Sequence, residues 1–394
     1  MTFTPEHTLF RDTVRAFVAA EIAPHLYAWD EAESFPRDLC RRAAHIGLLG
    51  LGYPEAYGST AADGWYGLIA TEEIARAGSG GLMAGLFSHT IGLPPIVTHG
   101  SETLKQRVVP GVLAGEKIAA LAITEPSGGS EVARLRCTVR LETNNGDASG
   151  DHFIIDGDKT SITSGMRADW ITLAVRTGAD ASQRGAAGNS LIAVPGDAPG
   201  LTRRPLAKMG WWCSDTAQLH FDHCRVPADH LIGAPNAGFR MVMENFNGKR
   251  LLMSAAAGTF AQVCNDEALD WARQRQTFGM ALVEHQVTRH KLMDMRMRIA
   301  STQAWLHALV QRQEEGATDA EWGAEERVAA LCLLKNHATQ TMQWCADAAV
   351  QILGGMGYMR GTKSERIYRE VKVMMIGGGA EEIMKQLAAR QLGV

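Results

Sequence analysis

The sequence predicts an α+β protein in which a β domain is inserted between two helical domains. Apolar residues recur at helical spacing over residues 1–120 and again beyond 233, whereas short runs rich in β-forming residues alternate with turns between them. We therefore expect an N-terminal helical domain over 1–120, a central antiparallel β domain over 121–232, and a C-terminal domain like a four-helix bundle over 233–394.

The 394-residue chain has the composition of a soluble globular protein, with 46% hydrophobic and 21% charged residues. It has no apolar run near the ~18 residues that a membrane span needs, and its formal charge of −4 comes without a basic stripe. We therefore expect neither a membrane nor a nucleic-acid partner. The N-terminus lacks a signal-peptide pattern, and the seven cysteines include no Cys-x-x-Cys pair. This predicts reduced cysteines, a cytoplasmic location and no metal site.

Two helices stand out in the N-terminal region. Phe10, Val14, Phe17 and Ile22 recur at roughly helical spacing, which predicts a first helix with one apolar face. A second helical stretch over 66–77 runs into Gly-Ser-Gly-Gly at 78–81, and glycines at such a place indicate the end of a helix.

The central region has the period of β-strands. Its β-rich runs lie at 152–155, 170–175, 190–194 and 218–221, and the dipeptide Asp156-Gly157 is typical of a hairpin turn. A helical pattern of about 10–15 residues would have to separate the strands of a parallel sheet, and none does. The pattern therefore favours antiparallel pairing over a dinucleotide-binding parallel sheet.

The C-terminal region carries two long apolar stripes with steps of three and four residues. Such spacing suits the packing of antiparallel helices in a bundle. The first stripe is Leu292, Met295, Ile299, Leu306 and Leu309, and the second is Ala338, Met342, Cys345, Ala349 and Ile352.

An apolar strand at 118–123 runs into the turn Thr-Glu-Pro-Ser-Gly-Gly-Ser at 124–130. Because glycine permits close approach of the backbone, such a turn can aim several N–H groups and the hydroxyls of Thr124 and Ser130 at one anion or heterocycle. Taken alone, this stretch is better interpreted as a plain surface turn. The rest of the chain changes that balance.

Further blocks accompany this turn. They are Gly-Asp-Lys at 157–159 with Ile-Thr at 162–163, Lys-Met-Gly at 208–210 with Ser-Asp-Thr at 214–216, Arg-Gln-Thr-Phe-Gly at 275–279, Glu-His-Gln at 284–286, Gln-Ile-Leu-Gly-Gly at 351–355 and Ile-Gly-Gly-Gly at 376–379. Together they resemble the acyl-CoA dehydrogenase family of flavoproteins over nearly the whole chain. The resemblance implies FAD, an acyl-CoA thioester substrate, electron-transfer flavoprotein as electron acceptor, and a homotetramer built as a dimer of dimers.

The resemblance also implies roles for individual residues. Thr124 would bind the isoalloxazine edge, Ser130 the diphosphate and the CoA arm, and Thr163 would face flavin N5, while Arg275, Gln286 and the 351–355 loop would reach the FAD of a neighbouring subunit. The implied cofactor residues are Thr124, Ser130, Ser161, Thr163, Arg275, Thr277, Phe278, Gln286, Gln351, Gly354, Gly355 and Glu382. The implied substrate residues are Ser130, Asn247, Arg250 and Gly378.

The chain departs from the family at the catalytic base. The family removes the proton α to the thioester carbonyl with a glutamate, which stands either in the C-terminal glycine loop or directly before the arginine of the helix that follows the β domain. Those positions are Gly378 and Lys249 here, and neither carries a carboxylate. Three explanations remain open. Glu244 or Glu381 reaches the α-carbon; Lys249 is a neutral base or an anchor for an acidic acyl group; or the chemistry has changed.

A second departure is Ser161, where the family often has a tryptophan against the flavin face. The loss of that ring would widen the site, and Trp211 or Trp212 on a later segment is a candidate to fill the gap. For both indoles, packing at a domain interface is an equally good interpretation.

The leading hypothesis is an FAD-dependent acyl-CoA dehydrogenase of fatty acid metabolism that forms the 2-enoyl-CoA. One alternative is a family relative with altered chemistry, namely an oxidase, a monooxygenase or a non-redox lyase on a thioester, which the two missing carboxylates favour. The other is a non-catalytic flavin-binding homologue. The visible spectrum of the purified protein, before and after addition of thioesters, separates the three.

Overall fold

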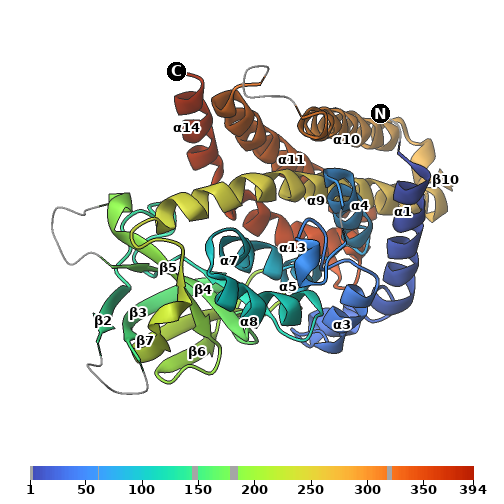
Figure 1. Cartoon of the computed structure of the whole chain (residues 1–394). Helices are drawn as coiled ribbons and strands as arrows, with labels where there is room; N and C mark the ends of the chain where they lie inside the picture. The colour runs from blue at the N-terminus through green and yellow to red at the C-terminus, as the bar shows by residue number, and fades with distance from the viewer. Residues whose placement is uncertain (1–2, 61, 144–149, 178–184, 317–321) are drawn as a thin grey trace.

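The computed structural model describes residues 3–60, 62–143, 150–177, 185–316 and 322–394. Its chain forms helices, then a sheet, then helices again, as Figure 1 shows. The long helix α9 (Gly238–Gln274) begins against the sheet, crosses the N-terminal helices and continues into the bundle, so that it connects all three regions. The predicted fold class is confirmed.

The N-terminal region is a layer of short helices whose ends are marked by capping residues. Its helices are α1 (Pro5–Phe17), α2 (Leu26–Glu31), α3 (Asp38–His45), α4 (Gly64–Ala75), α5 (Gly80–Leu86), α6 (His89–Gly92), α7 (Pro94–His99) and α8 (Glu102–Leu113). Gly78, with φ of +80°, follows α4, so the predicted end of that helix is confirmed. Gly80 and Gly81 instead open α5, because the Ser79 hydroxyl caps its first turn.

The sheet contains eight strands in the order β6-β7-β3-β2-β4-β5-β8, with β1 beside β4. Their bounds are β1 (Ala119–Ala122), β2 (Thr138–Glu142), β3 (His152–Thr163), β4 (Trp170–Arg176), β5 (Asn189–Pro195), β6 (Leu201–Pro205), β7 (Thr216–Pro227) and β8 (Leu231–Ile232). Most of the pairings are antiparallel, as predicted, but β1 pairs with β4 in parallel over four residues, which the sequence pattern did not predict. The chain leaves along β2 and returns along β3, so β4 resumes the direction of β1.

The predicted hairpin turn at Asp156-Gly157 is also wrong. Both residues lie inside the twelve-residue strand β3, at a shift of its register against β7. Gly157 has φ of +137°, and a Cβ there would lie 2.7 Å from the Cα of Cys137. The glycine is therefore explained by close approach of a neighbouring segment within a bulge, which the dipeptide alone does not distinguish from a turn.

The C-terminal region is a bundle of long helices. After α9 come the hairpin β9 (Gln276–Thr277) and β10 (Met280–Ala281), then α10 (Gln286–Glu314), α11 (Ala324–Leu353), α12 (Gly355–Tyr358), α13 (Lys363–Ile376) and α14 (Glu381–Gln391). All ten residues of the two predicted stripes are buried, most of them in the core shared with α9. The bundle therefore forms for the reason that the stripes indicate, which is burial of one apolar face per helix.

The structure also bears on two sequence predictions, which concern membrane-spanning helices and the cysteines. In the described ranges no single helix is long and apolar enough to cross a membrane; only α5 taken with α6 and α7 passes that test, across a bend of 52°. All seven cysteines are free and buried, which confirms that they act as apolar packing residues.

Candidate functional site

A buried ion pair between Glu125 and Lys159 holds the Thr-Glu-Pro turn in place. The fully buried Lys159 ammonium on β3 donates to the Glu125 carboxylate at 2.9 Å and to the carbonyl of Ile123 at 3.0 Å. The same carboxylate accepts the N–H groups of Arg136 and Cys137 at 2.7 and 2.9 Å. Burial alone would raise the pKa of Glu125, but the Lys159 charge and these N–H groups outweigh it and lower that pKa. One carboxylate thus ties β1, β3 and the segment after the turn together.

The turn is open and offers hydrogen-bond donors. Thr124 lies beside β3, where the N–H of Thr160 donates to its carbonyl at 2.9 Å. From Pro126 to Ser130 the turn is exposed, and a Cβ added at Gly128 would meet no atom within 4 Å. Within the described residues, no acceptor is recorded for the N–H groups of Gly129 and Ser130. Free N–H groups beside a hydroxyl suit a bound phosphate or a heteroaromatic edge.

The end of β3 brings two more predicted cofactor residues to this turn. A register shift lies between Lys159 and Ile162, and within it Ser161 takes φ of +60° with an exposed side chain. Pairing with β7 resumes at Ile162, opposite Ala217, and continues at Thr163, opposite Thr216. Because a bulge re-aims side chains, this one turns Ser161 outward next to Thr124. The structure therefore gathers the part of the predicted flavin site that belongs to the β domain.

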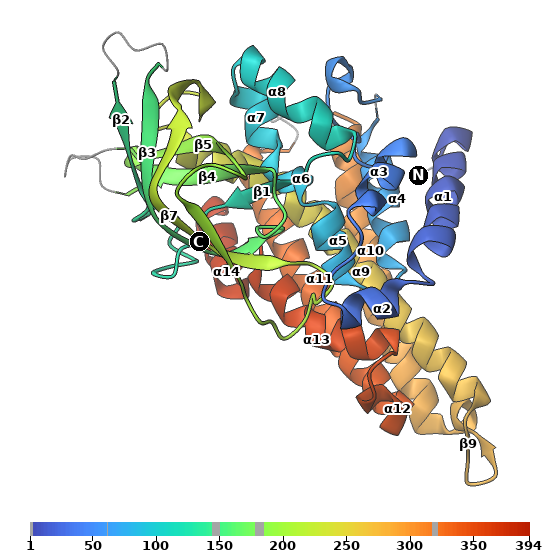
Figure 2. The same ribbon diagram turned by 90° about the horizontal axis from the view of Figure 1, so that it is seen from below.

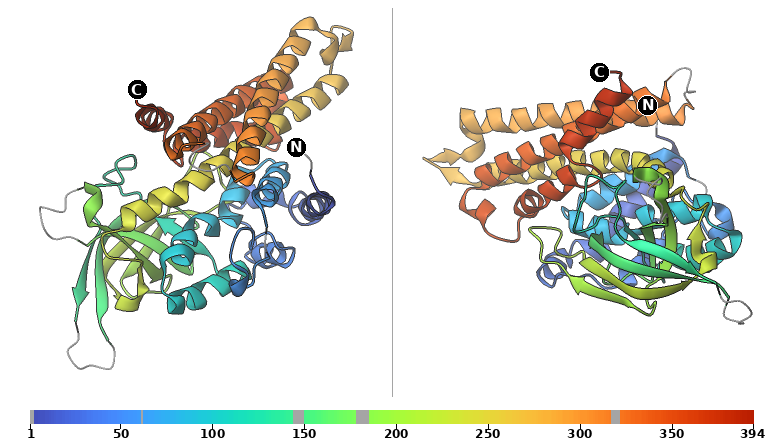
Figure 3. Two further views of the ribbon diagram at one scale, coloured as in Figure 1. Left: turned by 45° about the horizontal axis from the view of Figure 1, so that its top comes forward. Right: turned by 90° about the vertical axis from the view of Figure 1, so that its left-hand side faces the viewer.

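Seven of the predicted cofactor residues lie instead at the far end of the bundle. They stand at the β9–β10 hairpin, in the first turn of α10, and between the last turn of α11 and the start of α12, namely Arg275, Thr277, Phe278, Gln286, Gln351, Gly354 and Gly355. The two segments share one core, because Leu282 and Val283 pack on the cluster that contains Ile352 and Leu353. Figures 2 and 3 show this end opposite the β domain. Within one copy of the chain, these seven residues therefore lie far from the predicted cofactor residues of the β domain.

The hairpin tip has few partners within its own chain. Phe278 is 97% exposed and has φ of +49°, and the exposed Arg275 has no ion pair in the described part of the chain. Two contacts tie the tip to His285: the Thr277 hydroxyl lies 3.0 Å from its Nε2, and the Phe278 ring packs edge-on against its ring with 6.2 Å between the ring centres. An aromatic ring and a guanidinium presented together in this way are typical of an interface.

The two family positions of the base meet in space. Lys249 and Arg250 are adjacent on α9, and Arg250 Nε donates to the Gly378 carbonyl at 3.4 Å. Arg250 is buried and Lys249 is half-buried. The backbone of Asn247 lies one turn earlier on α9, and its side chain is outside the described part. Glu382 lies exposed in the first turn of α14, just after the glycine loop.

The electrostatic surroundings of Lys249 lack an anion. Burial lowers the pKa of the Lys249 amine to about 8. His89 of α6 lies close enough to Lys249 to interact with its charge, and Nε2 of His89 is 3.0 Å from the Leu49 carbonyl. Burial and the Lys249 charge lower the pKa of His89 to about 3, so this histidine is neutral near pH 7. In the described ranges no hydrogen bond or ion pair is recorded for Lys249 itself.

The residue that sequence reasoning missed is Lys335. It is fully buried on α11, and its ammonium donates to the carbonyls of Met375 and Gly379 at 2.7 and 2.8 Å. Burial and the charge of Arg250 lower the pKa of Lys335 to about 8. The signal was present, because Lys335 stands on an apolar helix face between Leu331 and Ala338. It holds the glycine loop against the bundle.

Trp211 and Trp212 pack between the β domain and the helices. Trp211 lies against α5, where a Cβ at Gly81 would come within 2.8 Å of its Cα. Trp212 lies between the guanidinium groups of Arg360 and Arg369, at 4.1 and 3.7 Å from the ring centre. The structure gives both indoles an interface role; their place beside a flavin stays a prediction.

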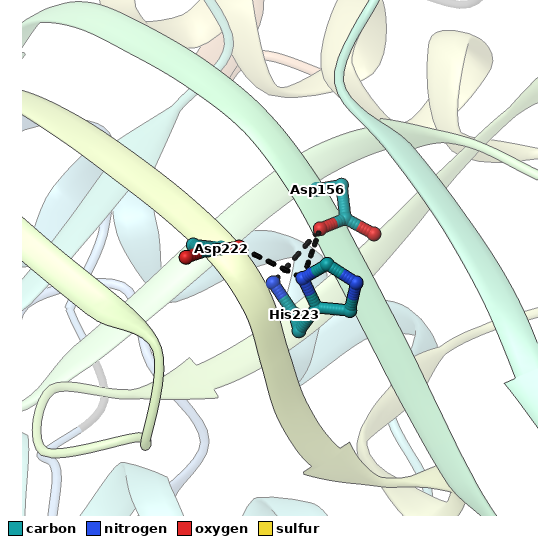
Figure 4. Close-up of side chains that lie close together, drawn as sticks. All are labelled: Asp156, Asp222 and His223. Carbon is teal, nitrogen blue, oxygen red and sulfur yellow. Dashed lines mark hydrogen bonds and ion pairs between the residues drawn. The ribbon is translucent and has the colours of Figure 1, made fainter.

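A cluster of Asp156, Asp222 and His223 lies on the sheet surface (Figure 4). The backbone N–H of His223 donates to Asp156 at 2.8 Å, and Nδ1 of the same ring lies 2.8 Å from the Asp222 carboxylate. The two carboxylates raise the pKa of His223, with the Asp222 hydrogen bond as the main cause. The ring and both acids therefore satisfy one another.

Comparison with known proteins finds a family match for each of the three regions. The sequence matches the models "Acyl-CoA dehydrogenase, N-terminal domain" over residues 4–116, "middle domain" over 120–224 and "C-terminal domain" over 236–393. It is 32% identical to the pig mitochondrial long-chain specific acyl-CoA dehydrogenase over 391 residues, covering 99% of this chain and 87% of that protein.

Solved structures agree in fold. A probable acyl-CoA dehydrogenase from Mycobacterium abscessus superimposes with a TM-score of 0.91, 42% identity and 99% coverage of both chains. A chain from a structure of the electron transferring flavoprotein of Acidaminococcus fermentans superimposes with a TM-score of 0.89 and 27% identity, covering 100% of this chain and 99% of that one.

Proposed function

The chain belongs to the acyl-CoA dehydrogenase family, and on that premise we propose that it binds FAD and oxidises an acyl-CoA thioester to the 2-enoyl thioester. Members of this family are flavin oxidoreductases, and the chain is an enzyme of that type. The observation that carries the proposal is the open turn at 124–130, which the buried Glu125–Lys159 pair fixes beside the end of β3.

The residues of this turn fit a flavin dinucleotide. Thr124 would bind the edge of the ring, Thr163 would lie on its N5 side, and the free N–H groups beside the Ser130 hydroxyl would receive the diphosphate. The bound flavin supplies the acceptor for a hydride from the β-carbon of the substrate. The chain itself orients that cofactor, because the ion pair below the turn leaves its backbone no freedom to move away.

The remaining cofactor residues point to a second copy of the chain. Arg275, Phe278 and Gln286 are exposed at the end of the molecule opposite the β domain, so they would complete the flavin site of a neighbour. Such reciprocal completion requires at least a dimer, and a dimer of dimers is the assembly that we propose. Gln351, Gly354 and Gly355 would approach the same diphosphate from the α12 side.

Substrate binding is assigned to the α9 and glycine-loop side of the site. Ser130, Asn247, Arg250 and Gly378 would border the thioester, and electrons would leave to an electron-transfer flavoprotein. The structural match to a chain from an electron transferring flavoprotein structure supports that acceptor. We propose a cytoplasmic location, which the seven free cysteines support.

The test is an anaerobic titration of the purified yellow protein with short, long and branched acyl-CoAs. Bleaching of the flavin absorbance by at least one thioester is the expected result. An oxidised flavin with every thioester would contradict dehydrogenation and favour altered chemistry, and a protein that stays colourless with added FAD would contradict flavin binding. As a control, Arg275→Ala should lower the affinity for FAD and leave the residues that border the thioester unchanged.

A further inference from the structure

The glycine loop is closed to a carboxylate in this chain. Gly378 has φ of +68°, and a Cβ there would lie 3.0 Å from the sulfur of Met253. Lys335 fixes the loop through two carbonyls, and Arg250 contacts a third. A side chain at this position would be strained and crowded, so the base has to come from elsewhere.

The nearby glutamates are engaged with other partners. Glu244 on α9 lies 3.0 Å from Arg240 and 3.3 Å from His99 of α7. Glu381 on α14 pairs with Lys385 at 2.6 Å and accepts the Gln340 amide at 2.7 Å. Each carboxylate would have to break two contacts to reach an α-carbon beside Lys249. The structure therefore disfavours the substitute acids that the sequence left open.

Lys249 is the remaining proton acceptor at the base position, and its surroundings suit a neutral amine. It lies near the neutral His89, it is followed by the cation Arg250, and no acid is recorded against it in the described part of the chain. An ammonium at this place gains nothing from a counter-ion and loses hydration on burial. With a pKa of about 8, about a tenth of the amine is neutral at pH 7.

We propose that the Lys249 amine is the base that removes the α-proton of the thioester, an inference that rests on the proposed function. The Nζ lone pair takes the α-proton and becomes an ammonium, and the Cα–H electron pair forms the new Cα=Cβ bond. The β-hydride leaves with its own electron pair to the bound flavin, which is the oxidant. The ammonium returns its proton to water once the product has left.

A lysine base at position 249 makes the rate of proton removal rise with pH, whereas loss of a proton from the neighbouring Lys335 would lower it. A lysine base works when it is neutral, so proton removal should rise about tenfold per pH unit below about 8 and level off above. Lys335 also has a pKa of about 8, but its loss of a proton releases the glycine loop and would lower the rate at high pH. The pKa of His89 is about 3 and pairing with Lys385 lowers the pKa of Glu381, so neither group changes its proton in this range.

The experiment isolates the proton step from hydride transfer. The holoenzyme is mixed in D2O with 3,3-dimethylbutyryl-CoA, which has α-hydrogens but no β-hydrogen, and deuterium uptake at the α-carbon is followed by mass spectrometry from pH 6 to 10. Lys249→Met should lower the exchange rate about 100-fold or more. Lys249→Glu should restore exchange without the rise between pH 6 and 8, because a glutamate is already ionised there. Lys105→Met on the α8 surface is the matched control and should behave as the parent does.

Flavin content and the melting temperature of each variant show that it is folded. Exchange by Lys249→Met at the parental rate and with the parental pH profile would overturn the proposal. So would a Lys249→Met that loses only the affinity for thioesters with an acidic acyl group, since this would make Lys249 an anchor. Exchange without flavin reduction by any oxidisable thioester would overturn the proposed function and leave the base assignment in place, whereas flavin reduction undiminished in Lys249→Met would do the reverse.

Discussion

Replacement of Lys159 by methionine is the sharpest test of the ion pair beneath the flavin turn. Methionine is close in length, so the change removes the ammonium with little change in volume. It leaves the buried Glu125 carboxylate with neutral donors alone, namely the N–H groups of Arg136 and Cys137 and the more distant Ser127 hydroxyl at 3.5 Å. It also removes the Lys159 donor from the Ile123 carbonyl. An uncompensated buried charge costs about 3–5 kcal/mol. We expect the apparent free energy of unfolding to fall by about that amount.

The assay is urea unfolding followed by far-UV circular dichroism, together with the ratio of flavin to protein after gel filtration. The double variant Glu125→Gln with Lys159→Met should be more stable than Lys159→Met alone, because it removes the orphaned charge and keeps one oxygen that can accept one of the two N–H groups. Lys117→Met is a matched control, since its ammonium is 53% exposed and 3.7 Å from Asp169, and it should change stability by about 0–1 kcal/mol. A loss below about 1 kcal/mol in Lys159→Met, with full flavin content, would refute the reasoning.

Three further predictions concern other parts of the chain. Burial raises the pKa of Glu370 from 4.5 to about 7. The free energy of unfolding should therefore fall by up to about 3 kcal/mol as pH rises from about 4.5 through 7. Glu370→Gln should abolish this fall when urea unfolding is compared at pH 5 and 8. Arg275→Ala should leave the melting temperature of the apoprotein unchanged but lower FAD retention on gel filtration, and unaltered retention would contradict the shared site. Gly378→Glu should destabilise the protein by about 1–3 kcal/mol in urea and should not rescue Lys249→Met, because its backbone has φ of +68°; rescue would show that the loop adapts.

Much of the fold was predictable because it rests on local patterns. The buried stripes of α10 and α11 follow from their spacing, and Gly78 marks the end of a helical stretch because its positive φ favours glycine. The errors arose where a local signal has two meanings. Asp156-Gly157 is the same dipeptide in a turn and in a bulge, and the parallel pairing of β1 with β4 depends on where the chain returns after β3.

The sequence by itself determined the family, the order of the domains, the turn at 124–130 and the absence of a glutamate at positions 249 and 378. Only the tertiary structure decided that Lys159 neutralises Glu125, that Lys335 holds the glycine loop, and that Lys249 lies near a neutral histidine while nearby acids pair elsewhere. The physical reason is that the charge state of a side chain depends on its burial and on the groups around it. Those groups come from helices and strands far apart in the chain, so their distances from one another are not written in any local pattern of residues.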